Sequence, residues 1–151
     1  MSTSPHAGAP LLDALRRLRT ELAVHDRVVA ETGRVRDRDL TVLEVLNREG
    51  PQTPTVLARR TNTHLATMTG VLTRLEKEGW IERRADANDR RSVRIHAASV
   101  DRFNALYADS VARLHTVFSG WSPEQAQAFL SSITDIAQAL EAPREAGSPT
   151  R

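Results

Sequence analysis

The sequence predicts a mostly α-helical fold that contains one short β-hairpin. Three observations support this prediction. Leucines recur at intervals of three and four residues, which places them on single helix faces. Proline and glycine stand where helices are expected to begin and end. The helical period is lost between residues 80 and 96, where two short strand-like runs flank a group of turn-forming residues.

Length and composition set the class of protein. The chain has 151 residues, enough for one domain with a sizeable core, and 40% of them are hydrophobic and 26% charged. No apolar run approaches the about 18 residues that span a bilayer, and Met1 to Pro10 lacks the basic and apolar segments of a signal peptide. We therefore expect a cytoplasmic protein with no membrane partner. The absence of cysteine excludes disulfides, thiolate nucleophiles and cysteine-based metal sites.

Four helices are predicted before the hairpin. The first spans residues 10–31, and its apolar face is formed by Leu11, Leu15, Leu18 and Leu22. A second helix spans 37–48 and ends before Gly50 and Pro51, and a short third helix opens with Thr53 as its N-cap and runs to residue 60. The fourth spans 64–78, ends at Gly79, and is expected to bury Leu65, Met68, Leu72 and Leu75.

The second half of the chain contains the hairpin and two long helices. The strands are expected at 80–84 and 92–96, with a basic turn between them. A helix over 99–120 is expected to be capped by Ser99. The last helix opens with the capping box of Ser122 and Gln125. Its apolar stripe consists of Phe129, Ile133, Ile136 and Leu140. Residues 1–9 and 142–151 are interpreted as disordered tails.

This order of elements describes a winged helix-turn-helix over residues 37–96, in which two close helices are followed by a basic hairpin. The predicted remainder is a first helix within 10–36 and two helices within 97–141. Positive charge is concentrated in the same region. Residues 59–94 carry nine basic and five acidic side chains, whereas residues 1–58 carry eight of each. All but one of the 21 basic residues are arginine, the side chain that binds phosphates and guanine edges in a bidentate manner.

The most specific pattern follows the second helix. Leu57-Ala58 precedes the run from Thr67 to Arg83, which reads T-x-T-x-x-L-x-R-L-E-x-x-G-W-I-x-R, and D-x-x-D-R-R follows at 86–91. This pattern resembles the MarR (multiple antibiotic resistance regulator) family of bacterial transcription factors. The resemblance is strong over 53–96 and weaker over 10–141. Three departures stand out: His64 replaces the usual serine cap, Gly70 replaces an arginine, and Ala97-Ala98 replace Leu-Thr.

The fourth helix is the candidate DNA-reading element, because one helix fits the major groove and residues near its N-terminus reach base edges. The residues in that position are His64, Ala66, Thr67, Thr69 and Gly70. If the leucine stripe faces the core, Arg74 lies with Thr67 and Gly70 on the opposite, DNA-facing side. Since Gly70 has no side chain for a base contact, sequence preference is expected to depend more on the hairpin and on DNA shape.

Further DNA contacts are expected from the hairpin. The resemblance implies that Arg90 and Arg91 at its tip enter a minor groove, with Arg91 the first choice. Arg84 and Arg94, on the strands, complete the expected DNA-binding set. Asp86 and Asp89 are expected to support this wing, with Asp89 paired to Arg91 or Arg74. Arg102, in the first turn of the following helix, is expected to matter little for DNA binding.

The resemblance also implies partners. The apolar faces of the first and last helices, Leu11 to Leu22 and Phe129 to Leu140, predict a homodimer, and symmetry then predicts binding to palindromic double-stranded operator DNA. It implies a repressor that is released by a small aromatic or phenolic effector. His25, Asp26 and Arg27 lie near the region where such pockets form in the family, although a solvated helix end is the favoured interpretation of these residues.

Two alternatives remain open. Gly70 favours a dimeric winged-helix module for protein interaction that no longer binds specific DNA, whereas the arginines at 74, 90 and 91 favour DNA binding. An enzyme is not expected, because the sequence has no nucleophile motif, phosphate loop or metal-ligand spacing among its five histidines. We expect neither a cofactor nor a metal.

Overall fold

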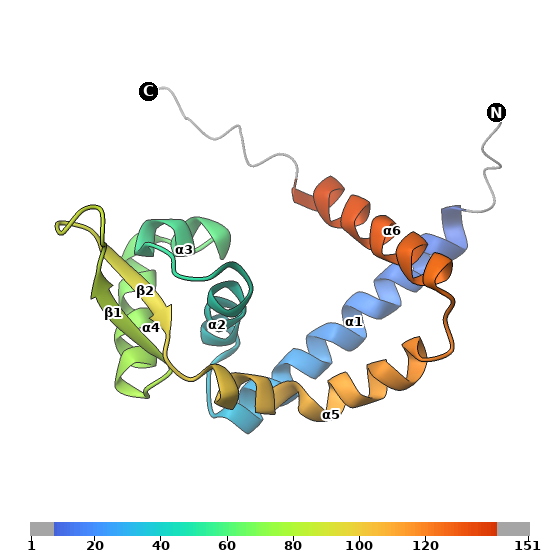
Figure 1. Cartoon of the computed structure of the whole chain (residues 1–151), viewed down its shortest axis with the longest axis horizontal. Coiled ribbons are helices and arrows are strands. Elements are labelled where there is room, and N and C mark those ends of the chain that lie inside the picture. The colour runs from blue at the N-terminus through green and yellow to red at the C-terminus, as the bar shows by residue number, and fades with distance from the viewer. Residues whose placement is uncertain (1–7, 142–151) are drawn as a thin grey trace. The chain divides into compact units, whose positions relative to one another are not determined.

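The computed structural model describes residues 8–141, which form six helices and one two-stranded antiparallel sheet (Figure 1). In chain order the elements are α1 (Gly8–Gly33), α2 (Asp37–Glu49), α3 (Pro54–Arg60), α4 (Leu65–Lys77), β1 (Ile81–Ala85), β2 (Val93–Ala97), α5 (Val100–Phe118) and α6 (Pro123–Glu141). The predicted fold class is thereby confirmed. Gly8 and Ala9, expected in a disordered tail, are helical, and the rest of both predicted tails lies outside the described residues.

Local capping explains why several helices begin and end where they do. The Thr53 hydroxyl accepts a hydrogen bond from the Val56 N–H at 3.3 Å, and proline follows at the first helical position. At the start of α6 the Gln125 N–H donates to the Ser122 hydroxyl at 3.2 Å, and the Ser122 N–H donates to the Gln125 side chain at 2.8 Å. This reciprocal pair is the predicted capping box. Gly79, after α4, has a φ of 75°, which glycine adopts without strain.

The chain divides into two compact units, with the boundary after Tyr107. The first unit holds the hydrophobic core, and α2 contacts α1, α3, α4 and β2. Its largest fully buried side chains include Leu40, Leu43, Leu57, Leu72, Leu75, Trp80 and Ile95. Phe103, at the start of α5, completes this core.

The buried face of α4 differs from the prediction by one position. Met68, Leu72 and Leu75 are buried as expected, but Leu65 is 51% exposed and Val71 is buried in its place. Leu65 is the first residue of α4, and a helical side chain leans toward the helix N-terminus, so it extends beyond the end of the core.

The hairpin is tied to the helices by a third segment. β1 and β2 pair antiparallel, with Ile81 opposite Ala97 and Ala85 opposite Val93. Gln52, between α2 and α3, exchanges two backbone hydrogen bonds with Ile95 at 3.1 and 2.8 Å. These hydrogen bonds hold the hairpin against the helical core.

The second unit contains the later turns of α5 and all of α6. None of its described side chains is buried within one chain. Phe118, Trp121 and Phe129 form an aromatic cluster, with ring centroids 5.0 Å apart between Trp121 and each of its neighbours. Within residues 8–141, no helix combines the length and apolarity that a bilayer crossing requires.

Candidate nucleic-acid interface

The N-terminal half of α4 presents an exposed surface of small or uncharged side chains. His64, Ala66, Thr67, Thr69 and Gly70, all expected to contact DNA, are exposed. His64 occupies the N-cap position but its side chain makes no capping hydrogen bond. The first backbone N–H groups of α4 therefore donate no hydrogen bond to that cap side chain, and the positive end of the helix dipole faces outward.

Gly70 stands in the middle of α4 without a structural need for glycine. A Cβ atom built at this position meets nothing within 4 Å. Glycine in a helix interior costs about 1 kcal/mol relative to alanine. Because no neighbouring group in the described chain requires this glycine, its bare backbone offers close approach to an external surface.

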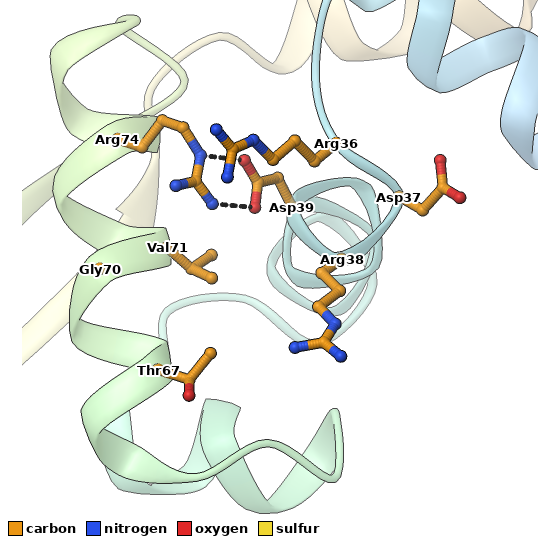
Figure 2. Close-up of a pocket in the computed structure, with 8 residues that line it drawn as sticks. All are labelled: Arg36, Asp37, Arg38, Asp39, Thr67, Gly70, Val71 and Arg74. Atoms are coloured by element: carbon orange, nitrogen blue, oxygen red, sulfur yellow. Dashed lines mark hydrogen bonds and ion pairs between the residues drawn. The ribbon is translucent and has the colours of Figure 1, made fainter.

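Arg74 does not face outward as expected. It donates two hydrogen bonds of 2.7 Å to the carboxylate of Asp39 in the first turn of α2 (Figure 2). Asp39 is fully buried, and the Arg74 side chain is 28% exposed. The hydrogen bonds to Asp39 raise the pKa of Arg74. Arg74 is therefore a strut between α2 and α4, and the prediction of an outward-facing arginine was wrong because Asp39 satisfies its guanidinium.

Two arginines that the sequence analysis did not single out flank this strut. Arg36 and Arg38 are exposed at the N-terminal end of α2 and line a pocket of about 490 Å³ that Thr67 and Gly70 also line (Figure 2). Neither guanidinium has a partner among the described residues. Arg38 carries a positive charge in the first turn of α2, where the helix dipole disfavours it. This unfavourable placement is visible in the sequence and indicates that Arg38 is available to bind an external anion.

The turn of the wing is closed by its own aspartates. Asp86 accepts from the Asn88 N–H at 2.9 Å and from Arg94 Nε at 2.6 Å, and these bonds lower the pKa of Asp86, the bond from Asn88 more than that from Arg94. Asp89 accepts from the backbone N–H of Arg91 at 2.9 Å. Asp89 is thus tied to Arg91 as expected, but through the Arg91 backbone N–H and not through its guanidinium, because the short Asp89 side chain folds back onto its own turn.

The strand arginines are directly opposite one another. Arg84 pairs with Arg94 across the hairpin, and like charges in this position repel. Each is neutralised by a carboxylate, Arg84 by Glu82 and Arg94 by Asp86. Both side chains are accessible to solvent, but their guanidinium groups already have anionic partners.

Arg90 and Arg91 differ from every other arginine of the predicted set. Both are exposed, and within residues 8–141 neither guanidinium makes a hydrogen bond or ion pair. Since the aspartates hold the turn through backbone groups, they leave these two cations free at the tip.

This arrangement agrees with comparisons to known proteins. Residues 37–93, which contain α2 to the start of β2, match the family model described as the MarR family. The uncharacterised HTH-type transcriptional regulator YfiV of Bacillus subtilis (strain 168) is 32% identical over 104 residues. That match covers 68% of this chain and 65% of YfiV, so the chain spans less than two thirds of this relative.

The chain resembles MarR family proteins in sequence and in fold.

Solved structures support the same fold. A MarR family protein from Bacillus stearothermophilus has a TM-score of 0.72 and 20% identity, covering 92% of this chain and 99% of its own. FabT of Streptococcus pneumoniae, solved in complex with DNA, has a TM-score of 0.66 and 23% identity, with 87% and 96% covered. NadR, solved with 4-hydroxyphenylacetate, has a TM-score of 0.65 and 21% identity, with 91% and 97% covered.

Arg102 has a defined contact in this structure. It was expected to matter little for DNA binding, and its guanidinium carbon lies 3.6 Å from the centroid of the Trp80 ring. Ser99, expected to cap α5, instead donates its hydroxyl to the Gly79 carbonyl at 2.7 Å. Both residues therefore contact the segment that directly follows α4 in the chain.

The apolar residues expected at a MarR-type dimer interface lie open in the single chain. Exposed members include Leu11, Leu18, Leu22, Phe129 and Leu140, and the last is 81% exposed. Leu15, Ile133 and Ile136 are half-buried.

A smaller pocket of about 210 Å³ lies between α1 and α2. Asp26 and Arg27 line it, together with Asp37 and Glu44. His25 does not line it, and instead lies 3.7 Å from Asp26 and beside the Tyr107 ring. Among residues 8–141, no three His, Asp or Glu side chains are grouped closely enough to hold a metal ion.

Proposed function

We propose that the protein is a homodimeric transcriptional repressor that binds palindromic operator DNA and is released by a small effector. In this proposal α4 is the recognition helix in the major groove, and the tip of the β1–β2 wing reaches a neighbouring minor groove. The solved complex of FabT with DNA, which shares this fold, supports the choice of partner.

The free guanidinium groups of Arg90 and Arg91 are the observation that carries the proposal. An exposed arginine in a turn with no partner in the described chain is suited to an anionic partner, and a narrow minor groove offers a concentrated negative potential. The backbone hydrogen bonds of Asp86 and Asp89 hold the turn that presents them. The carboxylates therefore shape the wing tip without pairing with its arginines.

The surface of α4 supports major-groove binding. Thr67 and Gly70 present little bulk, so the helix backbone can come close to base edges. Arg36 and Arg38 stand beside this surface on α2, and we assign them to phosphate contacts. Phosphate contacts fix register, while the groove-facing residues of α4 and the wing carry sequence preference.

A second copy of the chain is the proposed partner for the apolar faces of α1 and α6. Leu11 and Leu22 on α1 and Phe129 on α6 are all more than 40% exposed in the single chain, and large apolar side chains exposed along a helix mark a surface for a protein partner. Two-fold symmetry places two recognition helices about one turn of DNA apart, roughly 34 Å.

The proposed effector site is the pocket between α1 and α2. Its volume of about 210 Å³ is smaller than that of pockets that hold drug-sized ligands, so the pocket suits a single-ring molecule. Asp26, Asp37 and Glu44 are in its lining with Arg27. The excess of carboxylates favours a neutral phenol over an aromatic carboxylate such as the ligand of NadR.

A titration of labelled duplex tests the DNA-binding function. The purified protein is added to the DNA upstream of its own gene and to an unrelated duplex of equal length, at two salt concentrations. We expect tighter binding to the upstream duplex and weaker binding at the higher salt, because arginine contacts release counterions. Equal, weak affinity for both duplexes would favour the protein-interaction module. Affinity that does not change with salt would contradict the electrostatic basis of the proposal.

A further inference from the structure

The C-terminal end of α4 is held by the segment that opens α5. Three successive carbonyl groups, those of Glu78, Gly79 and Trp80, each accept a hydrogen bond from this segment. The donors are Arg102 Nη1 at 3.2 Å, the Ser99 hydroxyl at 2.7 Å and the Ala98 N–H at 2.9 Å, respectively. These carbonyls belong to Glu78, the C-cap residue of α4, and to the turn that leads from α4 to β1, so donors from another element fix the exit of α4 in place.

Arg102 adds a second contact that does not depend on the backbone. Its guanidinium lies over the face of Trp80, 3.6 Å from the ring centroid, and Trp80 is only 1% exposed. The Trp80 indole N–H is buried and has no hydrogen-bond partner among the described residues. Tryptophan therefore brings to this position an unpaired N–H together with a ring face that the guanidinium covers.

The electrostatic position of Arg102 points to the same conclusion. Arg102 lies in the first turn of α5, where the helix dipole disfavours a positive charge. The same guanidinium stands at the C-terminus of α4, where the dipole of that helix favours it. Its placement is therefore explained by α4 and Trp80, and not by the helix to which it belongs.

We propose that Arg102 is a positioning residue for DNA binding. It holds the C-terminal end of the recognition helix and the start of the wing in the orientation that operator binding requires. The proposal rests on the proposed DNA-binding function. Arg102 acts through Glu78 and Trp80, since its guanidinium is already engaged by the carbonyl and the ring. It differs in this respect from Arg91, which is proposed to touch DNA.

The test compares Arg102→Ala and Arg102→Lys with the wild type. Arg113→Ala is the matched control, because Arg113 is exposed on the same helix and makes no hydrogen bond or ion pair within the described part of the chain. Upstream duplex is titrated at several salt concentrations, and sizing and thermal melting identify the temperature range in which each variant is a folded dimer.

We expect Arg102→Ala to weaken binding by about tenfold, and Arg102→Lys to recover part of the loss by keeping a cation over the ring. The slope of log affinity against log salt should stay at the wild-type value, whereas loss of a phosphate contact lowers it by about one. Unchanged affinity, or a lower slope, in the folded dimer would overturn the positioning role.

A second readout separates this proposal from the proposed function. The chain has two tryptophans, so Trp121→Phe leaves Trp80 as the single emitter. In that background Arg102→Ala should shift the emission of Trp80 and speed hydrogen exchange at the last turn of α4. If the wild type binds no duplex, the proposed function fails. If emission and exchange are the same with and without Arg102, the positioning role fails even where DNA binds.

Discussion

Arg74 of α4 and Asp39 of α2 form a bidentate ion pair, with both N···O distances at 2.7 Å. The two residues are 35 positions apart, and the pair joins α4 to α2. Asp39 lies in the first turn of α2, where the helix dipole also favours a carboxylate. The orientation of α4 is therefore set by a specific polar contact as well as by its apolar face.

The first prediction concerns the unequal burial of this pair. Arg74→Met leaves the fully buried carboxylate of Asp39 without a partner and should cost about 3 to 5 kcal/mol of unfolding free energy. Asp39→Asn leaves Arg74, which is 28% exposed and can be hydrated, so the cost should be about 1 to 2 kcal/mol. Denaturant unfolding of both variants measures this order.

The double variant Asp39→Leu/Arg74→Met serves as the control, because it removes both charges together. It should be more stable than Arg74→Met alone. The reverse order of the two single variants would contradict the assignment of Asp39 as the buried partner.

The second prediction concerns Gly70. Gly70→Ala should stabilise the fold by about 0.5 to 1 kcal/mol, because the added Cβ meets open space and reduces the freedom of the unfolded chain. Operator affinity should not rise with it, since the methyl group stands on the surface proposed to approach DNA. Thermal melting and duplex titration are read together, and a loss of stability in the folded dimer would show that the chain itself needs this glycine.

The third prediction uses the single tyrosine of the chain. Burial, and then the hydrogen bond of 2.7 Å that Tyr107 donates to Glu44, raise the pKa of the phenol. The folded protein thus holds the phenol proton more tightly than the unfolded chain, whose value is about 10. This contribution to stability is complete below about pH 10 and is lost as the pH rises above it.

Near-ultraviolet absorbance during an alkaline titration measures this effect directly. The native protein should form no tyrosinate until it unfolds, whereas protein in denaturant should titrate near pH 10. A native titration that coincides with that of the denatured chain would contradict the contact with Glu44.

The fourth prediction concerns assembly. Leu140→Asp should weaken the dimer without unfolding the chain, because Leu140 is 81% exposed in the single chain. Ile133 is half-buried, so a charged substitution there would affect folding as well as assembly. Sedimentation at micromolar concentration compares the variant with Gln138→Asp, which places the same charge at an exposed polar site of α6. A dimer equally tight in both variants would exclude the end of α6 from the interface.

Local signals predicted most of the fold. The Ser122–Gln125 capping box and the Thr53 cap are pairs three residues apart, so they are visible in any short window of sequence. Periodicity located α4 but misplaced Leu65, because spacing does not show where a helix extends past the core.

The candidate site was less predictable, for reasons of distance along the chain. Exposure of Thr67 and Gly70, and of the two wing arginines, followed from the helix and turn patterns. The partner of Arg74 did not, because nothing local connects it to Asp39. Arg102 and Trp80 are likewise 22 positions apart, and their stacking depends on the path of the chain from β2 into α5.

The wing arginines are proposed to bind operator DNA, and titration of labelled upstream duplex with Arg91→Ala measures their contribution. Arg91 is exposed and fills no core space, so its loss should leave the fold and the dimer intact. We predict that Arg91→Ala weakens binding by about 1 to 3 kcal/mol per subunit at fixed salt, while Arg113→Ala binds as the wild type does. Equal affinity of Arg91→Ala and wild type would contradict the account and favour a protein-interaction module.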